Sequence, residues 1–503
     1  MPSSPPTRFT KRAFVIWCLT LLIVLIARIL GPSDLGQNLD QSKTIAFTLD
    51  MVNHNQWILP RDGLGELTRK PPMVNWLGAP IVALGFHNEL ALKLPAAVSG
   101  ITTSILVFFA ARFIFRRLDT DSADEADRSI AIHATPLAML AAAAWLASPS
   151  AVKHIYFMRP DILFTALLTG AWLASVILLT TQHPKHPRRL ALLIWTLTAA
   201  AILTKGPLAI FVPVYLILHT LIITPKEQRK AALARTGWQW GIPLVLVLPG
   251  LWLYSADRIN TEHVRNVLLG HELSNRVGSG GFSGFIQALT RNPGFFIERF
   301  IPWCIPAIIA MIFPPSSKLR THPLAPATLW IIVVLATTTL FTMRAGSYIM
   351  PAYPAAAILA VYALYRIIAS KRATRPRLAF VLIGSAVLIS ATLITLRETT
   401  MSRGARDRTG ENIKAFAHDA HQYIHSDPVR FNHMGDLPIA SLLGQHQSDA
   451  IESDTAITWL VQPTDTNPAL TPILTSAPLT THDPTTGEPI DSTITISLYR
   501  VSD

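Results

Sequence analysis

The sequence contains very little cysteine. Only Cys18 and Cys304 occur among 503 residues, and each lies inside an apolar run. Two separated cysteines supply neither a disulfide framework nor a thiolate metal site. Redox chemistry based on thiols is therefore not supported.

Charged side chains are also scarce, at 15% of residues, whereas 50% are hydrophobic and the mean hydropathy is +0.37. This composition is too apolar for an ordinary soluble enzyme and predicts a polytopic membrane protein. The formal net charge is +12, but Lys and Arg are scattered at the ends of apolar runs and form no stripe. Nucleic acid is therefore not an expected partner.

About eleven apolar runs are long enough to cross a bilayer as helices, since a hydrocarbon core of about 30 Å needs roughly 20 residues. With a cytoplasmic N-terminus, every alternate connection is short and rich in Lys or Arg, which is the positive-inside pattern. No small-residue cleavage site follows the first run, so we expect an uncleaved helix there. The expected spans are 13–30, 95–115, 131–149, 161–180, 190–204, 206–224, 237–254, 297–314, 323–342, 349–369 and 378–396.

This orientation places residues 31–94 on the periplasmic side as a first outer loop. Within it, WILPRDGLGELTRKPPMVNW gathers ionisable residues and prolines between Trp57 and Trp76. Tryptophans at such positions suit the headgroup level of a membrane. The run 73–86 is too short to span, so we expect an amphipathic or re-entrant helix in the outer interface.

The composition changes after residue 399, where acidic side chains outnumber basic ones and Thr and Pro become frequent. ENIKAFAHDAHQYI has helical spacing, and AITWLVQ and TITISLYRV read as strands. We expect a membrane domain over 1–399 and a small periplasmic α/β domain, or a partly disordered extension, over 400–503. The histidines of this tail lack HxH and HExxH spacing, so solvated surface histidines are favoured over a metal site.

Two carboxylates are candidates for chemistry. Asp40 follows the end of the first span, and Asp161 opens the fourth span behind Pro160. An acid that faces the bundle costs about 2.5–3.5 kcal/mol on insertion scales, which makes it a functional candidate. The structural alternatives are a solvated acid or N-cap for Asp40, and a helix-start acid favoured by the dipole for Asp161. Both alternatives stay open from the residues alone.

Four cations fall at outer helix ends: Arg69 and Lys70 in TRKPP, Lys205 in TKGP, and Arg344 in FTMRAGSY. Snorkelling anchors would explain any one of them. Lys205 is harder to explain in this way, because only a Gly-Pro pair separates it from the next span. At the hydrocarbon edge it would suit the phosphate of a lipid ligand.

A second outer loop is expected over 255–299. Glu272 and Arg276 stand four apart on one face of an expected helix, and GSGGFSG follows. A surface ion pair is the common structural explanation for that spacing. The glycine run lacks the Lys-Ser/Thr of a nucleotide loop, so a P-loop is rejected and a mobile lid over an outer cavity is favoured.

The stretch WILPRDGLGELTRKPPMVNWLGAPIVALGFHNELALKLPAAVSG resembles the first outer loop of bacterial GT-C glycosyltransferases of the aminoarabinose transferase and protein O-mannosyltransferase-like group. RPD at 159–161, TKGP at 204–207 and YIMPAYPAAAILA at 348–360 follow in the order of that group. The resemblance covers roughly residues 10–400. It implies an all-α polytopic fold of about 11–13 transmembrane helices, with a small C-terminal α/β domain.

The resemblance implies an inverting enzyme of the bacterial inner membrane. Such an enzyme moves a sugar from a polyprenyl-phosphate donor to a lipid A-like lipid, glycan or protein on the periplasmic face. Asp40 falls where the group has its catalytic first-loop carboxylate, and Asp161 would be a second acid of the pocket. The resemblance implies that the phosphate of the polyprenyl-phosphate donor is bound by Lys70, Lys205, Arg69 and Arg344. It implies a role in acceptor binding, or in a lid, for Glu272 and Arg276.

The sequence departs from the group at several positions. Gln41 and Lys43 follow Asp40 where Glu and Arg are common, and Leu273 stands where a His is common. These departures leave open the acceptor and any divalent metal ion; no other cofactor is implied. A polytopic transporter or lipid-linked glycan flippase remains the main alternative, although no internal repeat is visible. A lipid-linked polymer ligase or polymerase is a further one.

Overall fold

The structure is a computed structural model. It describes residues 8–30, 39–62, 65–85, 88–118, 124–155, 159–271, 281–313, 322–341, 346–369, 376–401, 409–424, 429–431, 459–463, 472–477, 479–482 and 489–500.

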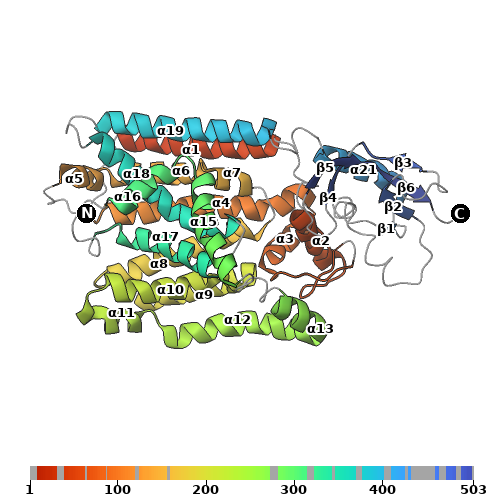
Figure 1. Ribbon diagram of the computed structural model, residues 1–503, viewed down its shortest axis with the longest axis horizontal. Helices are drawn as coiled ribbons and strands as arrows, with labels where there is room; N and C mark the ends of the chain where they lie inside the picture. The colour runs from red at the N-terminus through yellow and green to blue at the C-terminus, as the bar shows by residue number, and fades with distance from the viewer. Residues whose placement is uncertain are drawn as a thin grey trace.

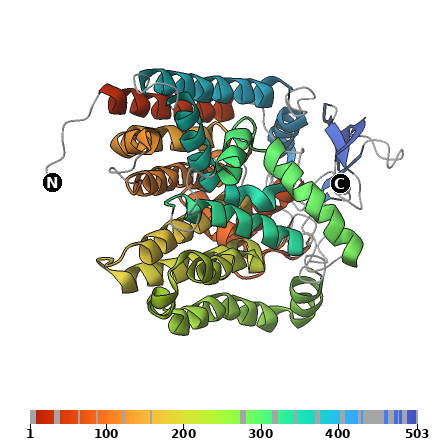
Figure 2. The ribbon, with the colours of Figure 1, turned by 60° about the vertical axis from the view of Figure 1, so that its left-hand side comes forward.

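Most of the molecule is a bundle of helices that run along its longest axis (Figure 1). The first helix, α1, packs beside the last long one, α19, as both views show (Figure 1, Figure 2). The longer helices are α1 (Arg8–Leu30), α4 (Asn88–Phe115), α6 (Ala134–Leu146), α8 (Pro160–Thr180), α9 (Pro187–Lys205), α12 (Trp238–Ile259), α15 (Gly281–Glu298), α17 (Ala325–Leu340), α18 (Tyr353–Ala369) and α19 (Pro376–Leu396). The shorter ones include α5 (Glu125–Ile132), α7 (Pro149–His154), α10 (Phe211–Leu218), α11 (Arg229–Arg235), α13 (Thr261–His263) and α16 (Cys304–Ile312).

The centre of the bundle is built largely from small side chains. Helix α6 is buried along almost its whole length, and six of its thirteen residues are alanines. Small residues let helix backbones approach closely, which is how helices associate where no water is available to drive them together. Larger rings fill the remaining space, with Trp172 stacked on Trp330 at 6.2 Å between centroids.

Seven described helices are long and apolar enough to cross a membrane, or eight if α5 and α6, bent by 84°, form one span. This number is lower than the eleven spans that the sequence predicts. Two of the expected spans contain short helices, since α16 has nine residues and α17 has sixteen. The expected spans 190–204 and 206–224 lie within one apolar segment, Pro187–Ile223.

That apolar segment crosses the bundle twice. Lys205, its midpoint, lies at the Asp161 end of α8. Farther along the chain, Arg235 Nη1 donates to the carbonyls of Thr181 and Gln182, which follow the other end of α8. The chain therefore returns along α8 between these points, so the two spans that the sequence predicts here are separate passes.

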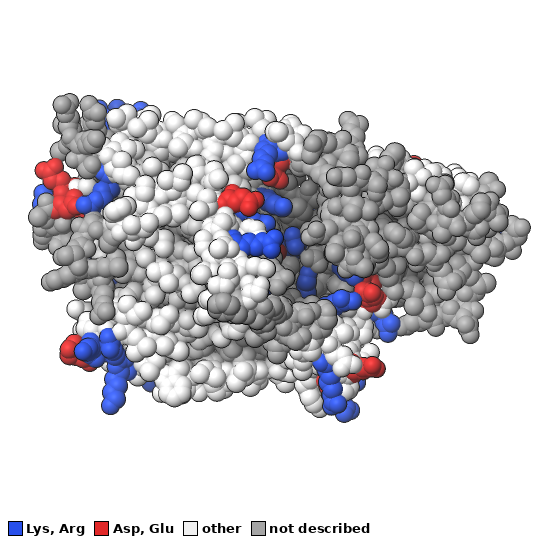
Figure 3. Space-filling model, in the orientation of Figure 1, with Lys and Arg blue, Asp and Glu red and all other residues white. Residues whose placement is uncertain are grey.

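The bundle has two different ends. One end, which we call the loop end, carries α2 (Leu39–Asn53), α3 (Met73–Ala83), α13 and the strands; α5 and α11 lie at the opposite end (Figure 1). On the face shown in Figure 3, described Lys, Arg, Asp and Glu side chains gather toward both ends, with uncharged surface between them. Together with the apolar helices, this distribution is that of a multi-pass membrane protein.

The first loop folds onto the bundle through α2 and α3. Ile45 and Leu49 of α2 and Val74 of α3 form one buried cluster with Leu163 in the first turns of α8. Asn75 Nδ2 donates to Thr44 O and Thr48 Oγ1, both at 2.8 Å, and so joins the two short helices. The short helix expected over 73–86 is confirmed as α3, and it packs against α4.

Among its described residues, the C-terminal part contains one helix and two small sheets, and the sequence predicts an α/β composition there. Helix α21 (Thr409–Ile424) packs Ile413 and Phe416 against Trp459 and Leu498. The strands are β1 (Val429–Phe431), β2 (Trp459–Pro463), β3 (Leu474–Thr475), β4 (Leu479–His482), β5 (Pro489–Ile494) and β6 (Ile496–Arg500). One sheet has the order β1-β2-β6-β3, with β1 parallel to β2, and β4 pairs antiparallel with β5. The domain boundary at residue 399 stays a prediction.

Candidate functional site

A buried ion pair lies at the loop end of the bundle. Asp161 is in the first turn of α8, where Pro160 begins the helix, and Lys205 is the last residue of α9. Lys205 Nζ lies 2.5 Å from Asp161 Oδ1, and the two side chains are 8% and 3% exposed. Helix α9 ends there because Gly206 follows with a φ of +74°, a conformation that other residues rarely adopt. The antiparallel packing of α8 and α9 therefore brings together two residues that are 44 apart in sequence.

A second cation and an aromatic ring surround this pair. Arg159 Nε lies 3.7 Å from Asp161 Oδ2, and Lys205 Nζ lies 4.3 Å from the centroid of the Tyr348 ring. Tyr348 belongs to η6 (Gly346–Ala352), the turn before α18. With Asp161 ionised, the three charged groups sum to one positive charge, which favours an anionic ligand.

The same surroundings do not fit a divalent metal ion. The carboxylate oxygens of Asp161 face Lys205 and Arg159, and both of these cations would repel a metal. In the described part of the chain, no three His, Cys, Asp or Glu side chains are grouped as metal ligands. We derive no step through a metal.

His154 is a further member of the site, which the sequence reasoning missed. It ends α7, is 2% exposed, and its Nδ1 donates to the carbonyl of Ser150 at 2.8 Å. Burial lowers the pKa of His154 to about 3, against the opposing influence of the Asp161 carboxylate. The imidazole is therefore neutral at pH 7, and its Nε2 carries a lone pair. The available signal was SPSAVKH, in which Ser148 caps a short helix that ends on His154.

The charged residues of the first loop pair mainly with one another. Lys43 Nζ lies 2.9 Å from Glu66 Oε2 and 3.3 Å from Asp62 Oδ2. Arg69 Nη2 lies 3.5 Å from the same Glu66 oxygen. The first-loop segment that begins at Trp57 and ends at Trp76, which we call the belt, is thus folded against α2. Lys43 of α2 is the central cation of these ion pairs.

The two tryptophans close this belt. Trp76 Nε1 donates to the carbonyl of Trp57 at 2.8 Å, so the ends of the segment meet. The belt also rests on α12 and α13, because Trp252 Nε1 donates to Ile58 O and His263 Nε2 pairs with Thr68 O. These contacts give the loop a fixed shape beside the bundle.

The other predicted site residues are placed as follows. Lys70 is half-buried directly before α3, where Thr68 Oγ1 bonds to its backbone. Asp40 lies in the first turn of α2, and its side chain is outside the described residues. Glu272, Arg276 and Arg344 also lie outside the described residues, so their roles stay predictions.

The Lys43–Glu66 pair leads to a pH-dependent prediction. A hydrogen bond from Lys43 lowers the pKa of Glu66 below its ordinary value of 4.5. The stability that this pair contributes is present above pH 4.5 and is lost as the pH falls through the lowered pKa. Because both side chains are partly exposed, we expect less than about 1 kcal/mol.

Limited proteolysis of the first loop at pH 7 and pH 4 measures this effect. In the native chain, cleavage should accelerate at pH 4, with the rate corrected for protease activity. Lys43→Met should cleave faster at pH 7 and lose most of the pH dependence. Lys226→Met, at the opposite end of the bundle, is the control and should behave as the native chain. A full pH dependence in Lys43→Met would contradict the assignment.

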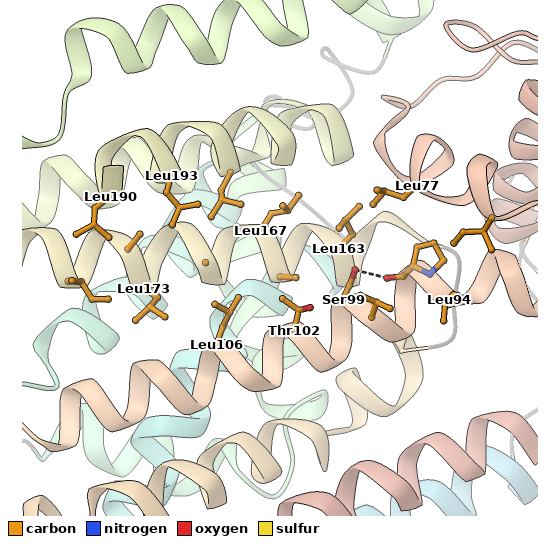
Figure 4. Close-up of a pocket in the computed structure, with 18 residues that line it drawn as sticks. Leu77, Leu94, Ser99, Thr102, Leu106, Leu163, Leu167, Leu173, Leu190 and Leu193 are labelled. Carbon is orange, nitrogen blue, oxygen red and sulfur yellow. Dashed lines mark hydrogen bonds between the residues drawn. The ribbon is translucent and has the colours of Figure 1, made fainter. Parts of the chain in front are cut away.

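An apolar groove runs beside α8, the helix that carries Asp161 in its first turn (Figure 4). It has a volume of about 560 Å³ and lies between α4, α8 and α9, with α3 near one end. Leu163, two residues after Asp161, lines the groove toward the end where Leu77 of α3 and Leu94 of α4 lie, on the right of Figure 4. Leu193 of α9 lines it toward the other end. One end of the groove therefore lies within a turn of α8 from the charged centre, and we call it the α4/α8/α9 groove.

Solved structures identify this architecture. The chain matches ArnT from Cupriavidus metallidurans, crystallised with undecaprenyl phosphate, with a TM-score of 0.64 and 17% identity over 97% of each chain. It also matches the oligosaccharyltransferase of Archaeoglobus fulgidus, with a TM-score of 0.57 and 11% identity over 90% of this chain and 69% of that one. The protein is therefore a polytopic membrane protein of the GT-C fold. Within that fold its arrangement is that of ArnT, as the resemblance of its first loop predicts.

The sequence relatives described next are uncharacterised proteins, so they give no information about activity. No family model matches the chain. An uncharacterised protein of Aquifex aeolicus is 26% identical over 359 residues, which is 67% of this chain and 62% of that protein. A second uncharacterised protein of the same organism is 24% identical over 177 residues. The chain therefore spans less than two thirds of the length of each of these relatives.

Proposed function

We propose that the protein is an inner-membrane glycosyltransferase that takes a sugar from a polyprenyl-phosphate donor on the periplasmic face. The acceptor is a lipid A-like lipid, a glycan or a protein. The observation that carries this proposal is a buried, net-positive centre that lies within one turn of α8 from an apolar groove. The fold shared with ArnT, which was crystallised with undecaprenyl phosphate, supports the same reading.

The donor has two chemically different parts, and the site offers a place for each. Its isoprenoid tail is apolar and stays in the bilayer, which fits the groove that Leu163 and Leu193 line. Its sugar-phosphate head is anionic and stays at the interface, which fits Lys205 and Arg159. Lys70, three residues before α3, is a further cation for the phosphate in this proposal.

The chemistry that this arrangement supports is a displacement at the anomeric carbon. The acceptor oxygen forms a bond to that carbon on the face opposite the phosphate, while the carbon–oxygen bond to the phosphate breaks. The electron pair leaves with polyprenyl phosphate, and Lys205 and Lys70 stabilise its growing negative charge. Asp40 takes the proton of the acceptor hydroxyl as general base. The anomeric configuration inverts because one displacement occurs.

Asp161 is a positioning residue in this proposal. It fixes the ammonium group of Lys205 at one point at the end of α9, together with the ring of Tyr348. A lysine on a flexible stem loses less freedom on binding phosphate when it is already held in place. Asp161 therefore acts on the donor through Lys205.

Replacing Asp40 tests the proposed reaction. Asp40→Asn keeps the size of the side chain but removes the base, so transfer should fall by about 10²–10⁴-fold. Binding of undecaprenyl phosphate to the purified full chain should stay within about twofold, because Asp40 contacts the acceptor. Mass spectrometry of envelope lipids and glycans in the native host, beside a deletion strain, reports the transfer.

The control variant is Asp257→Asn, which removes a carboxylate on α12 and should leave the glycan profile unchanged. An unchanged profile in the deletion strain would overturn the glycosyltransferase proposal. If the same strain showed altered uptake of a solute, the transporter alternative would replace it.

A further inference from the structure

The end of α15 contacts the turn η6 at both ends of that turn. Arg299, one residue after α15, packs on Gly346, the first residue of η6. One residue beyond η6, Tyr353 Oη donates to the carbonyl of Phe295 at 3.3 Å. The Tyr353 ring also stacks on the ring of Phe300, with 4.9 Å between the centroids and 2° between the planes. These contacts tie η6 to the end of α15.

The contact between Arg299 and Gly346 is very close. A Cβ added at Gly346 would lie 2.5 Å from Arg299 Nε and 2.8 Å from Arg299 Cζ, so the guanidinium lies directly against this glycine. The backbone of Gly346 is not left-handed, so glycine is needed there for space and not for its φ angle. Arg299 Cζ also lies 5.3 Å from the centroid of the Phe295 ring. The guanidinium of Arg299 therefore contacts both η6 and α15.

The turn η6 in turn contacts the charged centre. Tyr348 is its third residue, and the centroid of the Tyr348 ring lies 4.3 Å from Lys205 Nζ. Lys205 is the cation that the proposed function gives to the phosphate of the carrier, and Asp161 holds the same ammonium group. A continuous series of contacts thus runs from Arg299 through Gly346 and Tyr348 to Lys205.

We propose that Arg299 is a positioning residue for the donor phosphate. By packing on Gly346 it sets the place of η6, and η6 holds the ring of Tyr348 beside the ammonium group of Lys205. This inference rests on the proposed function and adds a residue outside the charged centre. The role depends on the flat shape of the guanidinium, which fits against a bare glycine backbone, and the compact ammonium of lysine does not reproduce that shape.

Binding titrations of the purified full chain with undecaprenyl phosphate test the role of Arg299. Arg299→Lys should weaken binding about tenfold although it keeps the charge, because a lysine that is no longer held in place at position 205 loses more freedom when it binds phosphate. Gly346→Ala should cause a similar loss, since the added methyl group displaces the guanidinium from η6.

Two control variants lie on α15. Arg291 is exposed, and its Cζ lies 5.6 Å from the centroid of the same Phe295 ring, so Arg291→Gln removes a cation from that ring without touching Arg299. A Cβ added at Gly294 would meet no atom within 4 Å, so Gly294→Ala adds the same methyl group in open space. Both variants should bind the carrier with native affinity.

A second substitution tests whether Arg299 acts through Tyr348. Tyr348→Leu removes the ring beside Lys205 and should by itself weaken binding about tenfold. Arg299→Lys combined with Tyr348→Leu should bind as tightly as Tyr348→Leu alone, because effects that act through one shared contact do not add. A combined loss of about a hundredfold would show that Arg299 reaches the phosphate by another route, and the inference would then be wrong.

Thermal unfolding of the same samples separates positioning from stability, with every titration made below the unfolding temperature of the variant. If Arg299→Lys and Gly346→Ala unfold earlier but keep native affinity, Arg299 only stabilises the fold and the inference fails. Native affinity in Arg299→Lys alone would also overturn it, since the charge would then be sufficient.

The outcomes distinguish this inference from the proposed function. If the native chain does not bind undecaprenyl phosphate, the donor site and the role of Arg299 both fail. If the native chain binds it and the deletion strain has an unchanged envelope, glycosyl transfer fails, and the titrations still decide whether Arg299 positions Lys205.

Discussion

Replacing Lys205 with methionine is expected to have two effects: it should destabilise the protein, and it should abolish binding of the polyprenyl-phosphate carrier. The substitution leaves Asp161 buried at 3% exposure without its nearest cation. Breaking a buried ion pair by removing one partner costs about 3–5 kcal/mol, because the remaining charge is uncompensated. Loss of the ammonium group should also remove measurable binding of undecaprenyl phosphate. Thermal unfolding in detergent and a binding titration measure the two effects.

A double variant separates the two consequences. Asp161→Asn with Lys205→Met removes both charges, so most of the lost thermal stability should return. Carrier binding should not return, since the cation for the phosphate is still absent. Lys226→Met, on the surface of the opposite end, is the control and should leave both measurements unchanged. Full carrier binding by the stable double variant would contradict the role that we give to Lys205.

Blocking the α4/α8/α9 groove is expected to weaken carrier binding without disturbing the charged centre. Val98 of α4 lines the groove one residue before Ser99 and is 52% exposed, so Val98→Trp places an indole in the space proposed for the isoprene units. Burial of each methylene contributes about 0.8 kcal/mol, so displacing a few of them should lower the affinity at least about tenfold. Binding titrations with undecaprenyl phosphate measure the change.

The matched control lies on the same helix. Ile105 is 40% exposed but does not line the groove, so Ile105→Trp adds the same ring to a neighbouring face of α4. Its affinity for the carrier should match that of the native chain. Both variants should unfold at the native temperature, because both positions already face outward. Equal weakening by the two variants would show that the tail binds elsewhere.

The charged centre and the α4/α8/α9 groove both lie beside the first turns of α8. The α4/α8/α9 groove is lined almost entirely by apolar side chains, with Ser99 and Thr102 among them, and suits a hydrocarbon tail. This arrangement explains why the charged residues of the site occupy helix ends at one face, where a lipid head can reach them.

Much of this protein could be predicted from its sequence, because the relevant signals are local. The apolar runs identify a membrane protein, since a helix must satisfy its own backbone in hydrocarbon. The first-loop residues that begin at Trp57 predict the GT-C fold, which the solved structures confirm. The sequence also placed Asp161 and Lys205 at one end of the bundle, because both stand where apolar runs begin or stop.

Only the tertiary structure decided which of these residues meet. Nothing in their spacing shows that Lys205 pairs with Asp161, or that Lys43 rather than Arg69 is the central cation of the first loop. A second groove, of about 710 Å³, likewise combines α7, the turn at Ile301 and the end of α19, which are far apart in the chain. Helix spans follow from the local affinity of side chains for hydrocarbon. Contacts between helix ends depend instead on how side chains of different sizes pack, and sequence spacing does not encode that packing.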